Sequence, residues 1–161
     1  MRPLLTCLAL LLPVLAFGAD ADEAALWKAL RDGGHVALMR HAIAPGVGDP
    51  AGFRLDDCTT QRKLSARGRA QARAIGERFR ANGIATAAVF SSQWCRCIDT
   101  ARELALGEVV AFPGLNSFFA DRGEEARHTA AVRALIGERA RSPLPLVLVT
   151  HQVNITALTG V

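Results

Sequence analysis

The sequence predicts an α/β domain with a mostly parallel central sheet that helices cover on both faces. Short apolar runs typical of strands alternate with segments of helical periodicity. The runs over residues 36–39 and 146–149 are continuously apolar, which is typical of strands buried on both faces. Arg40-His41, Ser91-Ser92 and Thr150-His151 each follow or close such a run. Because the carboxyl ends of parallel strands meet in one crevice, we expect these polar residues to lie close together.

Each element follows from periodicity and from the residues that end it. A first helix around residues 24–30 has an apolar face and is stopped by Gly33-Gly34. A second, over 66–82, begins after Ser65, a favourable N-cap. Residues 42–63 lack periodicity, so we expect a long loop of the kind that is usually functional. The remaining predicted elements are strands over 35–39, 87–91, 109–111 and 145–150, and helices over 94–106, over 124–140 and from Gln152.

Composition and the first residues indicate one globular domain behind an export signal. Half of the 161 residues are hydrophobic and 21% are charged, which is typical of a folded chain. Residues 1–21 combine a basic start, an apolar run and small-residue cleavage patterns, so we expect a signal peptide followed by a domain over 22–161. An uncleaved anchor is the alternative, but the run is short for a span of about 20 residues and a proline interrupts it. We expect export to the periplasm and no stable membrane span after cleavage. No closing strand is expected before Val161, so either the domain is short or the sequence is truncated, and we favour truncation.

The net charge of +4 is carried almost entirely by arginine. Five arginines lie along the helix expected at 66–82, which favours a solvated helix face over a nucleic-acid surface. No basic stripe interleaves with aromatic residues, so we expect no nucleic-acid partner. Mild basicity favours anionic ligands through long-range attraction.

Three cysteines follow the leader: Cys58, Cys95 and Cys97. Exported proteins meet oxidising conditions, so a disulfide is expected. A bridge between Cys95 and Cys97 is too tight within a helix, which makes Cys58 the partner of one of them and leaves one free thiol. The histidines and cysteines show no spacing typical of a metal site.

The strand ends carry residues suited to phosphoryl chemistry. His41 follows a strand beside Arg40, and a neutral imidazole with one nitrogen bound to a carbonyl keeps its other lone pair free for attack. Arg40, Arg96 and His151 could bind the equatorial oxygens of a phosphoryl group. Phosphoryl transfer depends mainly on such positioning and charge neutralisation. Taken singly, each residue is more readily explained by a structural ion pair.

Four short motifs containing these residues occur in order along residues 36–151. Each alone is a weak signal, because short patterns match by chance. Together they resemble the histidine phosphatase superfamily, on the branch that includes phosphoglycerate mutases and bacterial phosphohistidine phosphatases. The matching residues are Leu38-Met39-Arg40-His41 with Ala42 in a glycine place, Leu64-Ser65 with Gly68 and Gln71-Ala72, Ser91-Ser92 with Arg96 and Thr100-Ala101, and Val149-Thr150-His151.

The resemblance implies a doubly wound three-layer α/β sandwich, in agreement with the alternation of strands and helices. It implies that His41 is transiently phosphorylated and that no metal or organic cofactor is needed. Arg40, Arg96 and His151 would form the phosphate pocket around it.

The sequence departs from the family at the group that protonates the leaving oxygen. Many members carry a glutamate just after the third strand, whereas residues 114–119 contain no carboxylate. Asp121, Glu124 or Glu125 could replace it, although a solvated surface role is as good an explanation. Without an acid, which is typically worth about 100- to 10,000-fold in rate, the enzyme would need a good leaving group. Gln152 stands in the place of a glycine after the last histidine and could reach the substrate.

We therefore expect an exported, metal-independent phosphomonoesterase that acts on a small phosphorylated substrate through a phosphohistidine on His41. Periplasmic location would make envelope sugar phosphates natural substrates. One alternative is a phosphohistidine-protein phosphatase or a mutase, although a mutase needs an insertion that excludes water. The other is a non-catalytic module that binds a phosphorylated ligand in the same cationic pocket.

Overall fold

The computed structural model describes residues 18–161, with side chains from Glu23 onward. The predicted signal peptide falls almost entirely on residues 1–17, outside the described residues. Within the described part, no helix combines the length and apolarity needed to cross a membrane.

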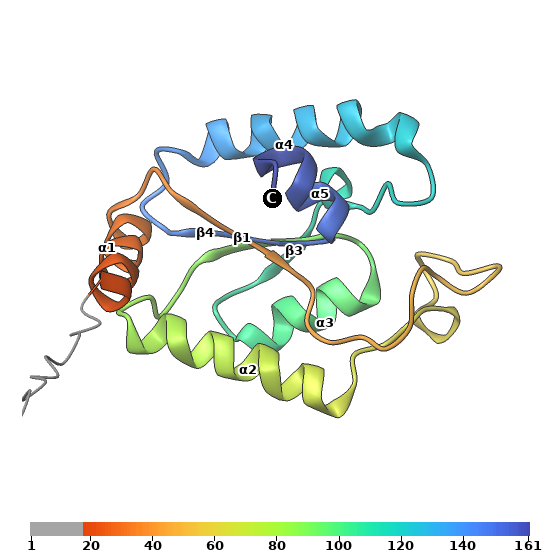
Figure 1. Cartoon of the computed structure of the whole chain (residues 1–161), viewed down its shortest axis with the longest axis horizontal. Coiled ribbons are helices and arrows are strands. Elements are labelled where there is room, and N and C mark those ends of the chain that lie inside the picture. The colour runs from red at the N-terminus through yellow and green to blue at the C-terminus, as the bar shows by residue number, and fades with distance from the viewer. Residues whose placement is uncertain (1–17) are drawn as a thin grey trace, which may run out of the picture.

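The fold is a parallel four-stranded sheet between two layers of helices, as predicted (Figure 1). The strand order is β1-β4-β2-β3, so the last strand in sequence is inserted between the first two. The strands are β1 (Val36–Arg40), β2 (Ala88–Ser91), β3 (Val109–Ala111) and β4 (Leu146–Thr150). β4 is buried at every residue, as expected of a central strand, whereas β1 lies at a sheet edge and is only half-buried. The prediction of a fully buried β1 was therefore wrong: among the described residues, β1 has a neighbouring strand on one side alone.

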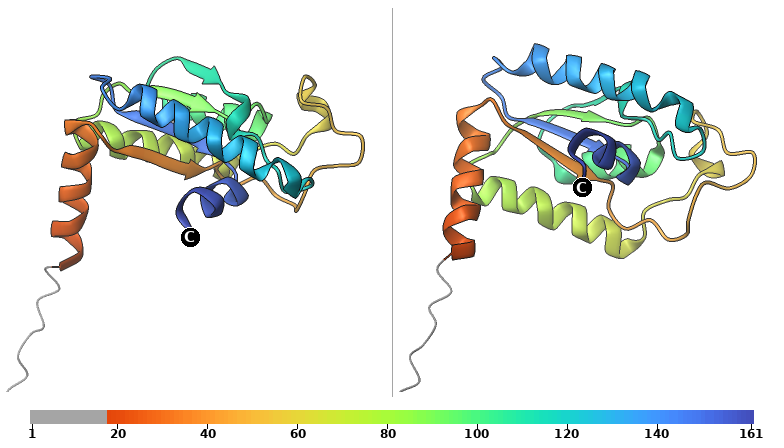
Figure 2. Two further views of the ribbon diagram at one scale, coloured as in Figure 1. Left: turned by 90° about the horizontal axis from the view of Figure 1, so that it is seen from above. Right: turned by 45° about the horizontal axis from the view of Figure 1, so that its top comes forward.

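Alternation along β4 divides its side chains between the two helical layers. Val147 and Val149 join the core formed with α2 (Ala66–Ala81) and α3 (Cys95–Leu104), and Leu146 and Leu148 face α4 (Glu125–Arg139). Because successive strand residues point to opposite faces, one short strand supports both layers. The α5 helix (Gln152–Thr159) follows β4 on the α4 side (Figures 1 and 2).

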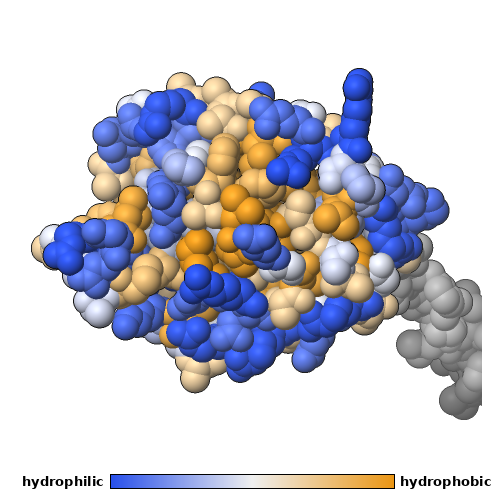
Figure 3. Space-filling model, turned by 180° about the vertical axis from the view of Figure 1, so that it is seen from behind, coloured by the Kyte–Doolittle hydropathy of each residue, from blue (hydrophilic) through white to orange (hydrophobic). Residues whose placement is uncertain are grey.

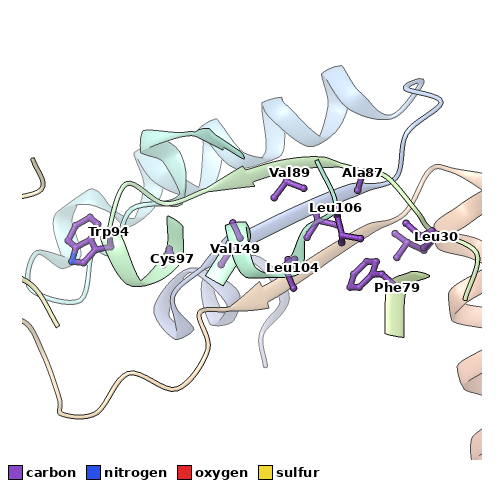
Figure 4. Close-up of a cluster of buried hydrophobic side chains, with 12 residues drawn as sticks. Leu30, Phe79, Ala87, Val89, Trp94, Cys97, Leu104, Leu106 and Val149 are labelled. Carbon is purple, nitrogen blue, oxygen red and sulfur yellow. The ribbon is translucent and has the colours of Figure 1, made fainter. Parts of the chain in front are cut away.

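The core under α2 and α3 extends from one end of the sheet to the other. Leu30 and Phe79 lie at the end near α1 (Gly18–Asp32), and Trp94 and Cys97 lie at the opposite end (Figure 4). The α1 helix is longer than the predicted 24–30, and its Trp27 packs edge-on against Phe79 at 5.1 Å between ring centroids. This core thus continues to the carboxyl ends of the strands.

The α2 and α3 helices are held together by glycine and by ion pairs. A Cβ at Gly76 would lie 2.1 Å from the Leu104 carbonyl oxygen, so glycine is required for this close helix contact. Arg69 and Arg73 of α2 pair with Glu103 of α3. The arginine-rich face predicted to be solvated is thus partly engaged by the neighbouring helix.

The face opposite the view of Figure 1 exposes apolar residues. In the view from behind, apolar residues gather in the middle of the face and hydrophilic ones surround them (Figure 3). β3 forms the sheet edge opposite β1, and its Val110 is 43% exposed.

Candidate active site

The insertion of β4 between β1 and β2 brings three strand ends together. Arg40 is in register with Thr150, and Ser91 with Val149. The next residue of each strand therefore lies at the same edge of the sheet. The His41 amide donates to the Thr150 carbonyl at 3.0 Å, which continues the ladder one residue beyond β1.

His41 is buried and its ring orientation is fixed by the backbone. Its Nδ1 lies 2.8 Å from the Ala42 carbonyl oxygen. A carbonyl can only accept, so Nδ1 carries the hydrogen and Nε2 keeps its lone pair. The Ala42 amide donates to Thr100 Oγ1 at 2.9 Å, which ties the turn after β1 to α3. The unprotonated Nε2 accepts a hydrogen bond from Arg96 Nε at 3.3 Å.

His151 faces His41 across the site, with 5.5 Å between the ring centroids. Its Nε2 lies 2.9 Å from Ser92 Oγ, and its Nδ1 lies 3.5 Å from Arg96 Nη2. Trp94 packs edge-on against the same ring at 5.2 Å between centroids. The turn between β2 and α3, together with the first turn of α3, thus orients this imidazole.

All four predicted site residues line one cavity of about 250 Å³. Arg96 is only 3% exposed, whereas Arg40 is exposed at the rim. A third guanidinium, that of Arg62, joins them. Three guanidinium groups and two imidazoles around one open cavity form a site suited to an oxyanion.

The surroundings favour the neutral form of both imidazoles. Burial lowers the pKa of His41 to about 4; the bond from Nδ1 to Ala42 opposes this, and the nearby Arg96 and Arg40 add to it. Burial, with Arg96 and His41 adding to it, lowers the pKa of His151 well below its usual value. A neutral His41 at neutral pH can act as a nucleophile.

None of the three carboxylates expected to protonate a leaving group lines the cavity. Asp121 accepts a hydrogen bond from the Gly123 amide at 3.0 Å and begins a short 3-10 helix. Glu124 pairs with Arg127, and Glu125 begins α4. Of the alternatives that the sequence left open, a solvated surface role fits these three residues, because the chain turns at Asp121 and starts α4 away from the strand ends.

The carboxylate that does enter the cavity is Asp49, from the loop over residues 42–63. Its Oδ1 lies 2.5 Å from Arg96 Nη1, and its Oδ2 accepts from Trp94 Nε1 at 3.0 Å. Asp49 and Arg62 were not singled out in the sequence. The only signal was the length of an aperiodic loop beside the first strand, which does not distinguish one residue of the loop from another.

The loop is attached to α3 by a disulfide between Cys58 and Cys95. This selects one of the two pairings that the sequence left open. Cys97 is the free thiol; it is buried with its Sγ 3.5 Å from His151 Nε2. Burial raises the pKa of the Cys97 thiol to about 12, so it stays protonated and is not a second nucleophile.

Other polar residues near the strand ends have structural roles. Asn116 Oδ1 accepts from the Gln93 amide at 2.9 Å and shapes the turn after β2. Gln152 lines the cavity, as expected, whereas Asn154 is buried and donates to the Asn116 carbonyl. His128 is a core histidine whose Nδ1 lies 3.2 Å from the Gly114 carbonyl oxygen. No group of three or more potential metal ligands occurs within residues 18–161.

Solved structures of two phosphatases and one hydrolase are similar in fold to this chain. The protein histidine phosphatase SixA complexed with tungstate is 19% identical, with 76% of this chain and 72% of that chain covered and a TM-score of 0.53. A mycobacterial glucosyl-3-phosphoglycerate phosphatase complexed with VO3 is 23% identical, with 78% and 79% covered and a TM-score of 0.57. A structure described as mycobacterial hydrolase 1 is 22% identical, with 78% of each chain covered and a TM-score of 0.55.

No curated protein sequence matches the chain. The model of the histidine phosphatase superfamily (branch 1), however, matches residues 36–121. This range contains the strand that leads into His41, the long loop, and the helix that carries Arg96. The chain belongs to the histidine phosphatase superfamily, branch 1.

Proposed function

We propose that this protein is a metal-independent phosphomonoesterase that works through a phosphohistidine on His41. The observation that carries the proposal is the pair of contacts made by that imidazole. Nδ1 is bound to the Ala42 carbonyl, and Nε2 faces the Arg96 guanidinium at 3.3 Å. A phosphoryl group bound by this guanidinium would lie beside an unprotonated ring nitrogen.

In the first half-reaction, Nε2 of His41 attacks phosphorus while the bond to the leaving oxygen breaks. Arg40, Arg96 and His151 hold the equatorial oxygens and neutralise their charge. In the second half-reaction, water attacks the phosphohistidine and releases phosphate, and His41 recovers its lone pair. The arginines supply the positive charge, so the proposal includes no metal-dependent step.

We propose periplasmic location and an envelope sugar phosphate as substrate. The Cys58–Cys95 disulfide favours an oxidising compartment, in line with the expected leader. One related structure is a phosphatase of a phosphorylated glycosyl compound, which favours the same substrate class. Fractionation of cells that express the full chain tests the location: the protein is expected in the periplasmic fraction.

A phosphohistidine-protein phosphatase is the second candidate, favoured by the rim of the cavity. Val47 and Phe119 both line it and are 93% and 56% exposed. Exposed apolar side chains beside a phosphate site suit contact with another protein surface. A protein histidine phosphatase is among the structures with this fold. Comparing kcat/KM for a phosphohistidine-bearing protein with that for sugar phosphates separates the two candidates.

The proposal is tested with p-nitrophenyl phosphate and the variant His41→Ala. His35→Ala is a matched control, because His35 lies at the amino end of β1, away from the cavity. We expect turnover to be lost in the first variant and kept in the second. Wild type that is quenched in alkaline denaturant, in which the P–N bond of a phosphohistidine survives, should carry one phosphoryl group, on His41. Phosphate binding without turnover on any phosphomonoester would instead indicate a binding module.

A further inference from the structure

A single carboxylate, that of Asp49, lines the cavity that contains His41 within the described part of the chain. The Asp49 side chain is 16% exposed and makes directional contacts with both oxygens. Oδ1 faces Arg96 Nη1 at 2.5 Å, and Oδ2 accepts from the Trp94 indole at 3.0 Å. A negative charge thus occupies part of a site built for anions.

The loop around Asp49 is stabilised by one of its own side chains, that of Arg62. The Arg62 side chain donates to the carbonyls of Gly48 at 2.5 Å, Ala44 at 2.7 Å and Gly46 at 2.8 Å. One guanidinium therefore fixes the backbone on the amino-terminal side of Asp49.

A second anchor holds the carboxyl-terminal part of the same loop. The disulfide from Cys58 to Cys95 fixes it to α3, one residue before Arg96. The position of the Asp49 carboxylate is therefore determined by the fold, at the same helix end that presents Arg96 to the cavity.

Arg96 places this carboxylate next to the proposed nucleophile. Its Nε faces His41 Nε2 at 3.3 Å, and its Nη1 faces Asp49. A phosphoryl group that binds the guanidinium therefore contacts His41 and displaces Asp49 Oδ1. The Trp94 indole can keep its bond to Oδ2, so the carboxyl group stays beside the phosphoryl group.

We propose, resting on the function proposed above, that Asp49 is the acid that protonates the leaving oxygen. Arg96 holds the Asp49 carboxyl group beside the place of the phosphoryl group, within the same cavity as His41, which is where a general acid must stand. Asp49 would replace the glutamate that is absent after β3.

The proton balance closes over the two half-reactions. As the bond from His41 Nε2 to phosphorus forms and the ester P–O bond breaks, the Asp49 carboxyl group gives its proton to the leaving oxygen. The resulting carboxylate then takes a proton from the attacking water as the P–N bond breaks. Both residues return to the states they have in the substrate complex. The proton that the Asp49 carboxylate takes up from solvent as the substrate binds is given back when phosphate leaves, so no further reactant is needed.

The test measures kcat/KM for a series of aryl phosphates whose leaving groups differ in pKa, in the wild type and in Asp49→Asn. We expect a loss of about 100-fold or more for phenyl phosphate and a much smaller loss for dinitrophenyl phosphate, because a good leaving group needs no proton. Asp56→Asn is the matched control: Asp56 lies in the same loop, is 86% exposed, and should leave the whole series unchanged.

Two results would overturn this assignment. An equal loss across the series would make Asp49 a structural residue, and a gain in rate with tighter inhibition by phosphate would make it only a competitor for Arg96. Asp49→Ser is a second variant. The asparagine side chain can turn its N–H groups toward the Arg96 guanidinium, which is also a donor, whereas serine avoids this contact. Failure of the proposed function is distinguishable: His41→Ala would then retain turnover, and no phosphoryl group would be trapped on His41 in any variant.

Discussion

Arg96 Nε and His41 Nε2 face each other at 3.3 Å, with the guanidinium supplied by α3 and the imidazole by the end of β1. The contact is buried at both ends. The guanidinium also reaches Asp49 and lies 3.5 Å from His151 Nδ1. One planar group therefore sets the spacing of the nucleophile, the second histidine and the carboxylate.

Arg96→Lys is expected to reduce kcat/KM for p-nitrophenyl phosphate by about 100- to 1,000-fold, the usual cost of removing one preorganised donor. Lysine keeps the charge but has no planar fork that can face several groups at once. The matched control is Arg102→Lys, at the exposed end of the same helix, which should leave activity unchanged. Wild-type activity in Arg96→Lys would show that charge alone suffices at this position.

The pH profile of kcat/KM should report the lowered pKa of His41. Attack requires the neutral ring, and burial lowers the pKa of His41 to about 4. The acid limb of the profile, which reports the free enzyme, is therefore expected near pH 4 rather than near the ordinary histidine value of 6.5. Measurement of kcat/KM in buffers of constant ionic strength from pH 3.5 to pH 8 locates this acid limb to about half a pH unit. An acid limb near 6.5 would contradict the burial of a neutral His41.

The same shift predicts a loss of stability in acid. Between the folded-state pKa of about 4 and the unfolded value of 6.5, the unfolded chain binds the extra proton, so the free energy of unfolding falls as pH falls through this window. The full shift corresponds to about 3 kcal/mol for His41. Glutamine does not titrate in this window. In urea unfolding, the free energy of unfolding of His41→Gln should therefore fall less than that of the wild type between pH 6.5 and pH 4, by about 3 kcal/mol. Parallel curves for the two proteins would contradict the prediction.

Periodicity located every strand and α-helix of the described chain, but neither the short 3-10 helices nor the order of the strands. The ends of the predicted helix 94–106 moved inward to Cys95–Leu104. Apolar runs cannot show that β4 lies between β1 and β2, yet this order is what brings His151 beside His41. The four motif residues were found because they lie at strand ends or in the first turn of a helix, where a short sequence pattern identifies the residues that form the site.

Residues outside regular elements escaped prediction for physical reasons. Asp49 and Arg62 act through the three-dimensional path of a loop with no repeat, so their spacing carries no signal. The choice between Cys95 and Cys97 depends on the phase of α3. Two residues along a helix differ by more than half a turn, so Cys95 faces the loop while Cys97 faces the sheet.

Removal of the disulfide is expected to cost both stability and activity. Cys58 and Cys95 are 37 residues apart, and closing a loop of that size restricts the unfolded chain by about 4 kcal/mol. The bond also holds the loop that carries Asp49 to the helix that carries Arg96. Cys58→Ser should therefore lower the free energy of unfolding by roughly this amount and reduce kcat/KM, as measured by urea unfolding and steady-state kinetics.

Cys97→Ala is the control for that experiment, since Cys97 is not bonded. It should retain the sensitivity of the wild type to dithiothreitol, whereas Cys58→Ser should show none. Sensitivity that persists in Cys58→Ser would mean that reduction acts elsewhere in the protein.

Gly68 allows α2 to approach the chain just after His41, so Gly68→Ala should impair the site. A Cβ there would lie 2.1 Å from the Ile43 carbonyl oxygen, which is backbone and cannot move without displacing the turn at Ala42. Gly137→Ala is the matched control on α4, because nothing lies within 4 Å of its Cβ position. In the control, alanine in place of helical glycine should raise the free energy of unfolding by about 1 kcal/mol with activity unchanged. In Gly68→Ala, kcat/KM should fall even though the substitution is otherwise favourable in a helix. Equal activity in both variants would show that the turn after β1 tolerates displacement, and that the position of His41 does not depend on α2.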